Sequence, residues 1–158
     1  MMERIEALAQ LCRQSEIDIL YVFGNRAGEV KAWLEGAGSA LSPSLSDVDI
    51  GVKAAQGKVL HVHDKVLLAL SLEDLLGVTR VDLVSLEEAD PFLAANVIRR
   101  ERLYARDSYQ ADEYELYVLR RAGDLAPLER ERLTLILEGS YDTGDDLLTG
   151  GERPSGLG

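Results

Sequence analysis

The spacing of apolar and polar residues changes from a helical to a strand-like period near the start of the chain. Residues 1–14 place apolar side chains every three or four positions, which predicts an amphipathic helix. Its expected inward positions are Ile5, Leu8, Leu11 and Cys12. Residues 17–23 are mostly aliphatic, β-branched or aromatic and end at a Gly-Asn pair, as is typical of a buried strand followed by a turn.

The next segment combines a short helix, a loop and an alternating strand. Residues 26–35 predict a helix with Val30, Trp33 and Leu34 directed inward. Residues 36–46 are rich in Gly, Ala and Ser and predict a flexible loop. Carboxylates and aliphatic residues then alternate over residues 47–52. Because strand side chains alternate between faces, Asp47 and Asp49 are expected on one face, with Val48 and Ile50 on the other.

The middle of the chain predicts two helices separated by a third strand. Residues 62–76 have helical spacing and are followed by Gly77, a typical helix terminator. The expected inward positions of this helix are Val66, Leu67, Leu70 and Leu75. Residues 80–86 predict a strand that carries Asp82. Asp90 and Pro91 resemble an N-cap and first helical position, and they open a helix to about residue 100.

The last third of the chain is mainly helical in pattern. Residues 102–105 predict a short edge strand, and residues 110–122 and 127–138 predict helical stretches broken near Gly123, as one bent helix or a helical pair. From Gly139 the chain is glycine-rich and acidic, so we expect a disordered tail over 139–158. The whole predicts one α/β (α+β) domain over 1–138, with a small mixed sheet flanked by helices. Its core spans 1–107 and its C-terminal helical segment 108–138.

Composition and charge limit the substrates and the cellular compartment that we expect for this domain. The chain has 158 residues and a net charge of −11, which disfavours a DNA or RNA polymer as a direct substrate. Its apolar runs are shorter than the about 20 residues needed to span a bilayer. Neither a signal peptide nor a disulfide is indicated, because the N-terminus is acidic and amphipathic and Cys12 is the single cysteine. We therefore expect a cytoplasmic protein without a membrane segment.

Three aspartates are the strongest candidates for chemistry. Asp47 and Asp49 would share one strand face, and Asp82 on another strand could complete an all-oxygen site. Such oxygen ligands suit Mg²⁺, and two Mg²⁺ ions can stabilise the attacking and leaving oxygens of a phosphoryl transfer. The turn after the first strand supplies a second element. Gly24 would allow close approach of a phosphate, Asn25 could donate a hydrogen bond, and Arg26 would add positive charge.

Three segments resemble the signatures of minimal nucleotidyltransferases in the DNA polymerase β superfamily. They are residues 21–27 (YVFGNRA), 46–51 (SDVDIG) and 80–84 (RVDLV). Residues 97–107 are similar to the segment that follows the core in the antitoxin subgroup. The resemblance implies a polymerase β-like fold and the transfer of AMP from ATP with two Mg²⁺ ions. It also implies a partner, a HEPN-family ribonuclease toxin whose tyrosine accepts the AMP. The oligomeric state is open between a hetero-oligomer with this toxin and a homo-oligomer.

Two departures from that family keep other functions open. Asn25 occupies a position where the family usually has serine, and residues 26–46 form a longer connection to the first aspartate. One alternative is an antitoxin that neutralises its toxin by binding alone, and another is a transferase acting on a small acceptor such as an aminoglycoside. Trp33 could cover apolar surface or stack on a base or partner, and the cluster Arg99, Arg100, Arg102 and Arg106 could be solvated or contact a phosphate or partner.

Overall fold

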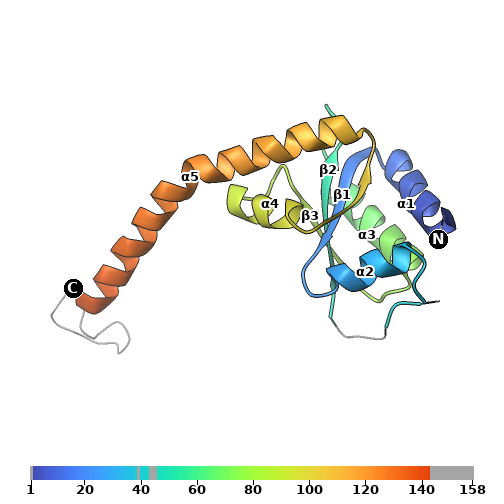
Figure 1. Ribbon diagram of the computed structural model, residues 1–158, viewed down its shortest axis with the longest axis horizontal. Helices are drawn as coiled ribbons and strands as arrows, with labels where there is room; N and C mark the ends of the chain where they lie inside the picture. The colour runs from blue at the N-terminus through green and yellow to red at the C-terminus, as the bar shows by residue number, and fades with distance from the viewer. Residues whose placement is uncertain (1, 39, 43–45, 143–158) are drawn as a thin grey trace. The chain divides into compact units, whose positions relative to one another are not determined.

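A mixed four-stranded sheet organises the part of the chain that the computed structural model describes, residues 2–38, 40–42 and 46–142 (Figure 1). The strands are β1 (Ile17–Phe23), β2 (Val48–Ala54), β3 (Val81–Ser85) and β4 (Glu101–Ala105), in the order β3-β2-β1-β4. β1 is antiparallel to both β2 and β4, whereas β2 and β3 are parallel. This confirms the predicted mixed sheet and the edge position of β4.

The helices cover the two faces of the sheet unequally. α1 (Met2–Gln14), α2 (Ala27–Leu34) and α3 (Val62–Leu76) lie on one side, and α4 (Pro91–Ile98) lies on the other (Figure 1). The main core forms between the sheet and the three-helix layer, and from the strands it takes residues that include Leu20, Val22, Val48, Ile50 and Val52. Since strand side chains alternate, the intervening residues of β1 and β2 face the opposite side.

The start of α5 (Ser108–Asp142) is joined to the sheet by a polar network. The buried Tyr21 hydroxyl donates a hydrogen bond to Oε2 of Glu115 at 2.6 Å. Arg102 pairs with Glu115 at 3.1 Å and with Asp112 at 3.0 Å. Burial and the bond to Glu115 raise the pKa of Tyr21, so the phenol remains a donor. The chain divides into two compact units, Met1–Leu119 and Arg120–Gly158, and this network lies within the first.

The C-terminal helix differs from its prediction. α5 is one continuous helix that passes through Gly123 and Pro127, so of the two predicted alternatives the single helix is confirmed and the helical pair is wrong. Gly and Pro lower helix propensity, but the intervening and flanking residues are mostly strong helix formers such as Ala, Leu, Glu and Arg. The helix continues to Asp142, and the rest of the expected tail lies outside the described residues.

The orientation of α3 also differs from its prediction, although its bounds are as expected. Leu68, Leu72 and Leu76 face the core, while the expected inward residues Val66, Leu67 and Leu70 are exposed. The helix has aliphatic residues on more than one side, so spacing alone does not select the buried stripe. Ile5 of α1 is also exposed, whereas Leu8 and Cys12 of the same helix are buried as predicted. No helix among the described residues is both long and apolar enough to cross a membrane.

Candidate active site

The turn after β1 lies directly against one of the candidate metal ligands. Gly24 has a φ of +78°, and a Cβ added there would overlap Oδ2 of Asp49 and lie 3.2 Å from its carboxyl carbon. The strand register explains this proximity, because Phe23 pairs with Asp49 across the antiparallel β1–β2 ladder. Only glycine therefore combines the left-handed backbone with the space that Asp49 occupies.

The three aspartates meet at the same end of the sheet. Asp49 and Asp82 are aligned partners in the parallel β2–β3 ladder, and residues aligned in this way point to the same face. Asp47 stands two residues before Asp49, immediately ahead of β2, with the buried Val48 between them. The predicted alternation of carboxylate and core positions is thus present in the structure.

The electrostatics of this end of the sheet favour a cation. Burial, followed by the negative charges of Asp82 and Asp47, raises the pKa of Asp49. Nε of Arg80 lies 3.3 Å from Oδ2 of Asp47 and compensates part of the charge. In the described ranges no group of three or more His, Cys, Asp or Glu side chains is arranged so that it could hold a metal ion. The donor chemistry still fits Mg²⁺, which usually keeps several water molecules and takes phosphate oxygens beside one or two carboxylates.

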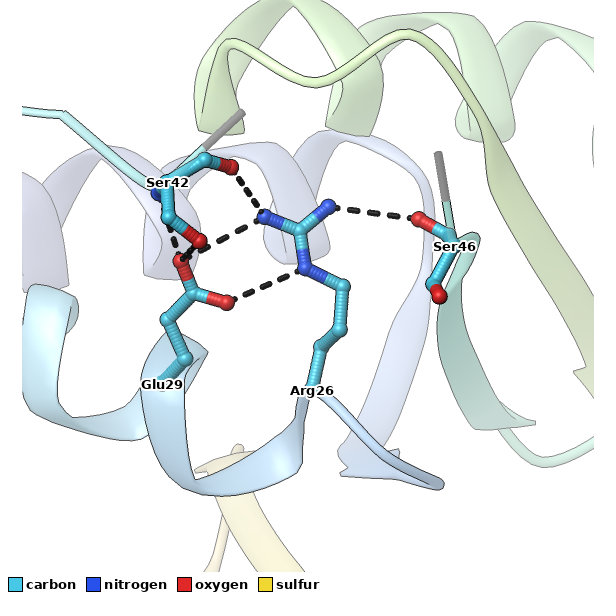
Figure 2. A network of polar contacts seen from close by, with 4 residues as sticks. All are labelled: Arg26, Glu29, Ser42 and Ser46. Carbon is cyan, nitrogen blue, oxygen red and sulfur yellow. Dashed lines mark hydrogen bonds and ion pairs between the residues drawn. The ribbon is translucent and has the colours of Figure 1, made fainter. Parts of the chain in front are cut away.

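The other two residues expected at the phosphate differ in accessibility. Asn25 is exposed at the turn, whereas Arg26 is only 6% exposed and points toward the segment before β2 (Figure 2). Its Nε donates to Glu29 at 3.1 Å, and its terminal nitrogens donate to the carbonyls of Ser42 at 2.7 Å and Ser46 at 3.2 Å. Arg26 is therefore occupied by protein partners in this conformation.

Glu29 completes the network, and sequence reasoning did not single it out. Oε2 of Glu29 accepts hydrogen bonds from both the backbone N–H and the hydroxyl of Ser42, each at 2.6 Å. The hydrogen bonds from Arg26 and then from Ser42 lower the pKa of Glu29 to about 2. The only signal in the sequence was the spacing of Arg26 and Glu29, which places oppositely charged side chains on neighbouring positions of a helix.

The remaining candidate residues are mostly engaged within the protein. Trp33 is buried, and the guanidinium of Arg4 lies 4.4 Å from its ring centroid, which supports the role of covering apolar surface. The arginine cluster is divided between two situations. Arg99 and Arg100 are exposed, while Arg102 pairs with α5 and Arg106 pairs with Asp18 at 3.1 Å.

Removing Arg80 should strengthen cation binding at the aspartates. Arg80→Ala takes away a positive charge that must move from Asp47 when Mg²⁺ binds, and exposed ion pairs are weak. We expect the affinity for Mg²⁺ to rise by roughly two- to fivefold in calorimetric titration. Arg13→Ala, which disrupts a similarly exposed pair with Glu6 on α1, is the matched control. Weaker binding of ATP in Arg80→Ala would instead make Arg80 a phosphate ligand.

Comparisons with known proteins identify the family and agree with the fold. The family model described as polymerase beta nucleotidyltransferase matches residues 6–109. A search of curated proteins gave no match. The fold is similar to the MNT antitoxin in a complex with a tri-AMPylated Shewanella oneidensis HEPN toxin, with a TM-score of 0.61, 19% identity, and coverage of 86% of this chain and 98% of that chain.

Two further solved structures show the same fold. One is the toxin–antitoxin MntA–HepT, with a TM-score of 0.62, 19% identity, and coverage of 87% of this chain and 99% of that chain. The other is a toxin–antitoxin with AMP-PNP, with a TM-score of 0.62, 20% identity, and coverage of 84% of this chain and 98% of that chain. The resemblance seen in the three sequence motifs is therefore confirmed, and this chain belongs to the polymerase β nucleotidyltransferase family.

Proposed function

We propose that this protein is a Mg²⁺-dependent nucleotidyltransferase that moves AMP from ATP to a tyrosine of a HEPN-family toxin, and so acts as an antitoxin. The contact between the Gly24 turn and Asp49 carries the proposal, because it sets an anion-accommodating turn beside a carboxylate that borders Asp47 and Asp82. The similar antitoxin bound to a tri-AMPylated HEPN toxin supports the choice of acceptor, and the complex with AMP-PNP supports an adenine nucleotide.

Each residue has a distinct part in the proposed reaction. The backbone of Gly24 and the exposed side chain of Asn25 would bind the triphosphate, while Asp47 and Asp49 would hold Mg²⁺. Bound Mg²⁺ supplies charge neutralisation to the phosphates. Asp82 would accept the proton of the tyrosine hydroxyl. The tyrosine oxygen then bonds to the α-phosphorus of ATP, and the bond from this phosphorus to the leaving pyrophosphate breaks.

Label transfer tests this function directly. The protein is incubated with ATP labelled at the α-phosphate, Mg²⁺ and a candidate HEPN-type partner protein, and the products are separated and mapped by mass spectrometry. We expect label on a tyrosine of the partner and release of pyrophosphate. Absence of label with Mg²⁺ and with Mn²⁺ would contradict the enzymatic proposal.

Neutralisation by binding alone is the second candidate, and two observations favour it. Asn25 replaces the usual serine, and Asp47 is already paired with Arg80. Under this alternative, Asp47→Asn would still neutralise the toxin in a growth assay, whereas an enzyme would lose that ability. Transfer of AMP to an aminoglycoside without any protein partner would favour the small-acceptor alternative.

A further inference from the structure

The segment that lengthens the connection between α2 and β2 is fastened near its end. One guanidinium, that of Arg26, donates to two backbone carbonyls in this segment, those of Ser42 and Ser46 (Figure 2). Ser46 immediately precedes Asp47, and the amide of Val48 is in turn bonded to the Arg80 carbonyl at 3.1 Å. The Ser46 carbonyl that Arg26 binds therefore belongs to the peptide bond that joins Ser46 to Asp47, the first candidate metal ligand.

The strength of this attachment follows from burial and charge. Arg26 is 6% exposed, and its charge is balanced by Glu29, whose side chain is 31% exposed. Hydrogen bonds between charged groups are stronger than those between neutral groups, and their loss would leave a buried cation without a partner. Glu29 also binds Ser42, so the two charged residues hold the same residue of the segment. Arg26 binds the carbonyl of Ser42, and Glu29 binds its amide and hydroxyl.

The same bonds compete with phosphate binding by Arg26. A guanidinium has five N–H donors, and Arg26 makes four hydrogen bonds to Glu29, Ser42 and Ser46. These bonds use four of the five donors, and the carboxylate of Glu29 already neutralises the charge that would attract a phosphate. Arg26 is thus built into the protein interior, unlike the exposed Asn25 beside it.

We propose that Arg26 and Glu29 form a clasp that fixes Ser42 and Ser46, and that this clasp positions Asp47 for binding of Mg²⁺ and nucleotide. Arg26 is then a positioning residue and does not contact the triphosphate. This inference rests on the proposed nucleotidyltransferase function, since Asp47 is the residue positioned. It also gives a role to Ser42 and Ser46 of the lengthened segment, because both become part of the structure that supports the site.

Three variants separate a clasp from a phosphate ligand. Arg26→Lys keeps the charge but loses the planar fork, Glu29→Ala frees the guanidinium, and the double variant combines both. The clasp predicts a loss of kcat/KM for AMP transfer in all three, by roughly 10- to 100-fold in Arg26→Lys and in the double variant alike, and by less in Glu29→Ala, where Arg26 can still bind the two carbonyls. If Arg26 binds phosphate, Glu29→Ala keeps or improves the KM for ATP while Arg26→Lys raises it, and the clasp is overturned.

Hydrogen exchange of the protein alone provides a readout that does not depend on activity. The amides of residues 46–49 should exchange faster in the three variants than in the wild type, while those of α3 should be unchanged. Unchanged exchange at residues 46–49 would overturn the clasp. If exchange is faster in the variants but the wild-type protein itself transfers no AMP, the clasp is retained and the proposed function is rejected.

A matched control and a conservative variant guard against general effects. Lys31→Met removes another ion pair of α2, the exposed pair with Glu101, and should change neither exchange at residues 46–49 nor AMP transfer. Glu29→Gln keeps an acceptor for Ser42 and Arg26 while removing the charge, so it should fall between the wild type and Glu29→Ala. If Glu29→Gln is worse than Glu29→Ala in a folded protein, the clasp is contradicted.

Discussion

Substituting Gly24 with alanine is expected to abolish most nucleotidyl transfer and to destabilise the fold. The new Cβ would overlap Oδ2 of Asp49, and the residue would have to keep a φ of +78°. Either the turn or the carboxylate must move, so the triphosphate site and the metal site are disturbed together. We expect AMP transfer to fall by about 100-fold or more, and the free energy of unfolding to fall by roughly 1–3 kcal/mol in denaturant titration.

The neighbouring Gly28 offers a matched control four residues along the chain. It is exposed in α2, and a Cβ there would have no atom within 4 Å. Gly28→Ala should therefore leave transfer unchanged and raise the free energy of unfolding by up to about 1 kcal/mol. Equal losses of activity in the two variants would show that the contact between Gly24 and Asp49 has no special importance.

Asp49→Asn is expected to separate activity from stability. The amide cannot supply the anionic oxygen that Mg²⁺ prefers, so AMP transfer should fall by at least about 100-fold, equivalent to about 2.7 kcal/mol of activation free energy. Without divalent cations, however, the fold should become more stable at neutral pH. The substitution removes a charge that burial, Asp82 and Asp47 all disfavour.

The pH dependence of stability gives the sign of this effect. A raised pKa means that folded Asp49 holds its proton more tightly than the unfolded chain does, so stability falls as pH rises through this range. The penalty is absent below the ordinary carboxyl pKa and complete above the raised one. In EDTA, the gain from Asp49→Asn should therefore shrink as the solution is acidified. A gain that is independent of pH, or a loss at neutral pH, would refute this account of Asp49.

Local sequence signals predicted most of the sheet and the placement of the aspartates. β1 has the predicted bounds, because a mostly apolar run ends at a glycine that the turn requires. Asp47 and Asp49 flank the buried Val48, as the alternation of side chains along a strand predicts. The Asp90 N-cap was equally local, and its carboxylate accepts hydrogen bonds from the amides of Phe92 and Leu93.

What the sequence did not reveal depends on contacts between distant residues. The buried stripe of α3 is selected by the sheet on which it packs, so Leu68 and Leu72 are chosen over Val66 and Leu70 without a local cue. The hydrogen bonds of Arg26 to the carbonyls of Ser42 and Ser46 were not predicted, because these partners lie 16 and 20 residues away. Such pairings become visible only when the chain is folded.

The attachment of Ser42 and Ser46 limits how strongly the length of the connection between α2 and β2 affects the protein. The entropy lost on closing a flexible loop grows only logarithmically, so doubling its length costs only about 0.6 kcal/mol more. Because Ser42 and Ser46 are held by hydrogen bonds to Arg26 and Glu29, we expect chain added near Gly36 to alter this entropy while leaving the approach to Asp47 unchanged. The connection can thus vary in length without loss of registry at the carboxylates.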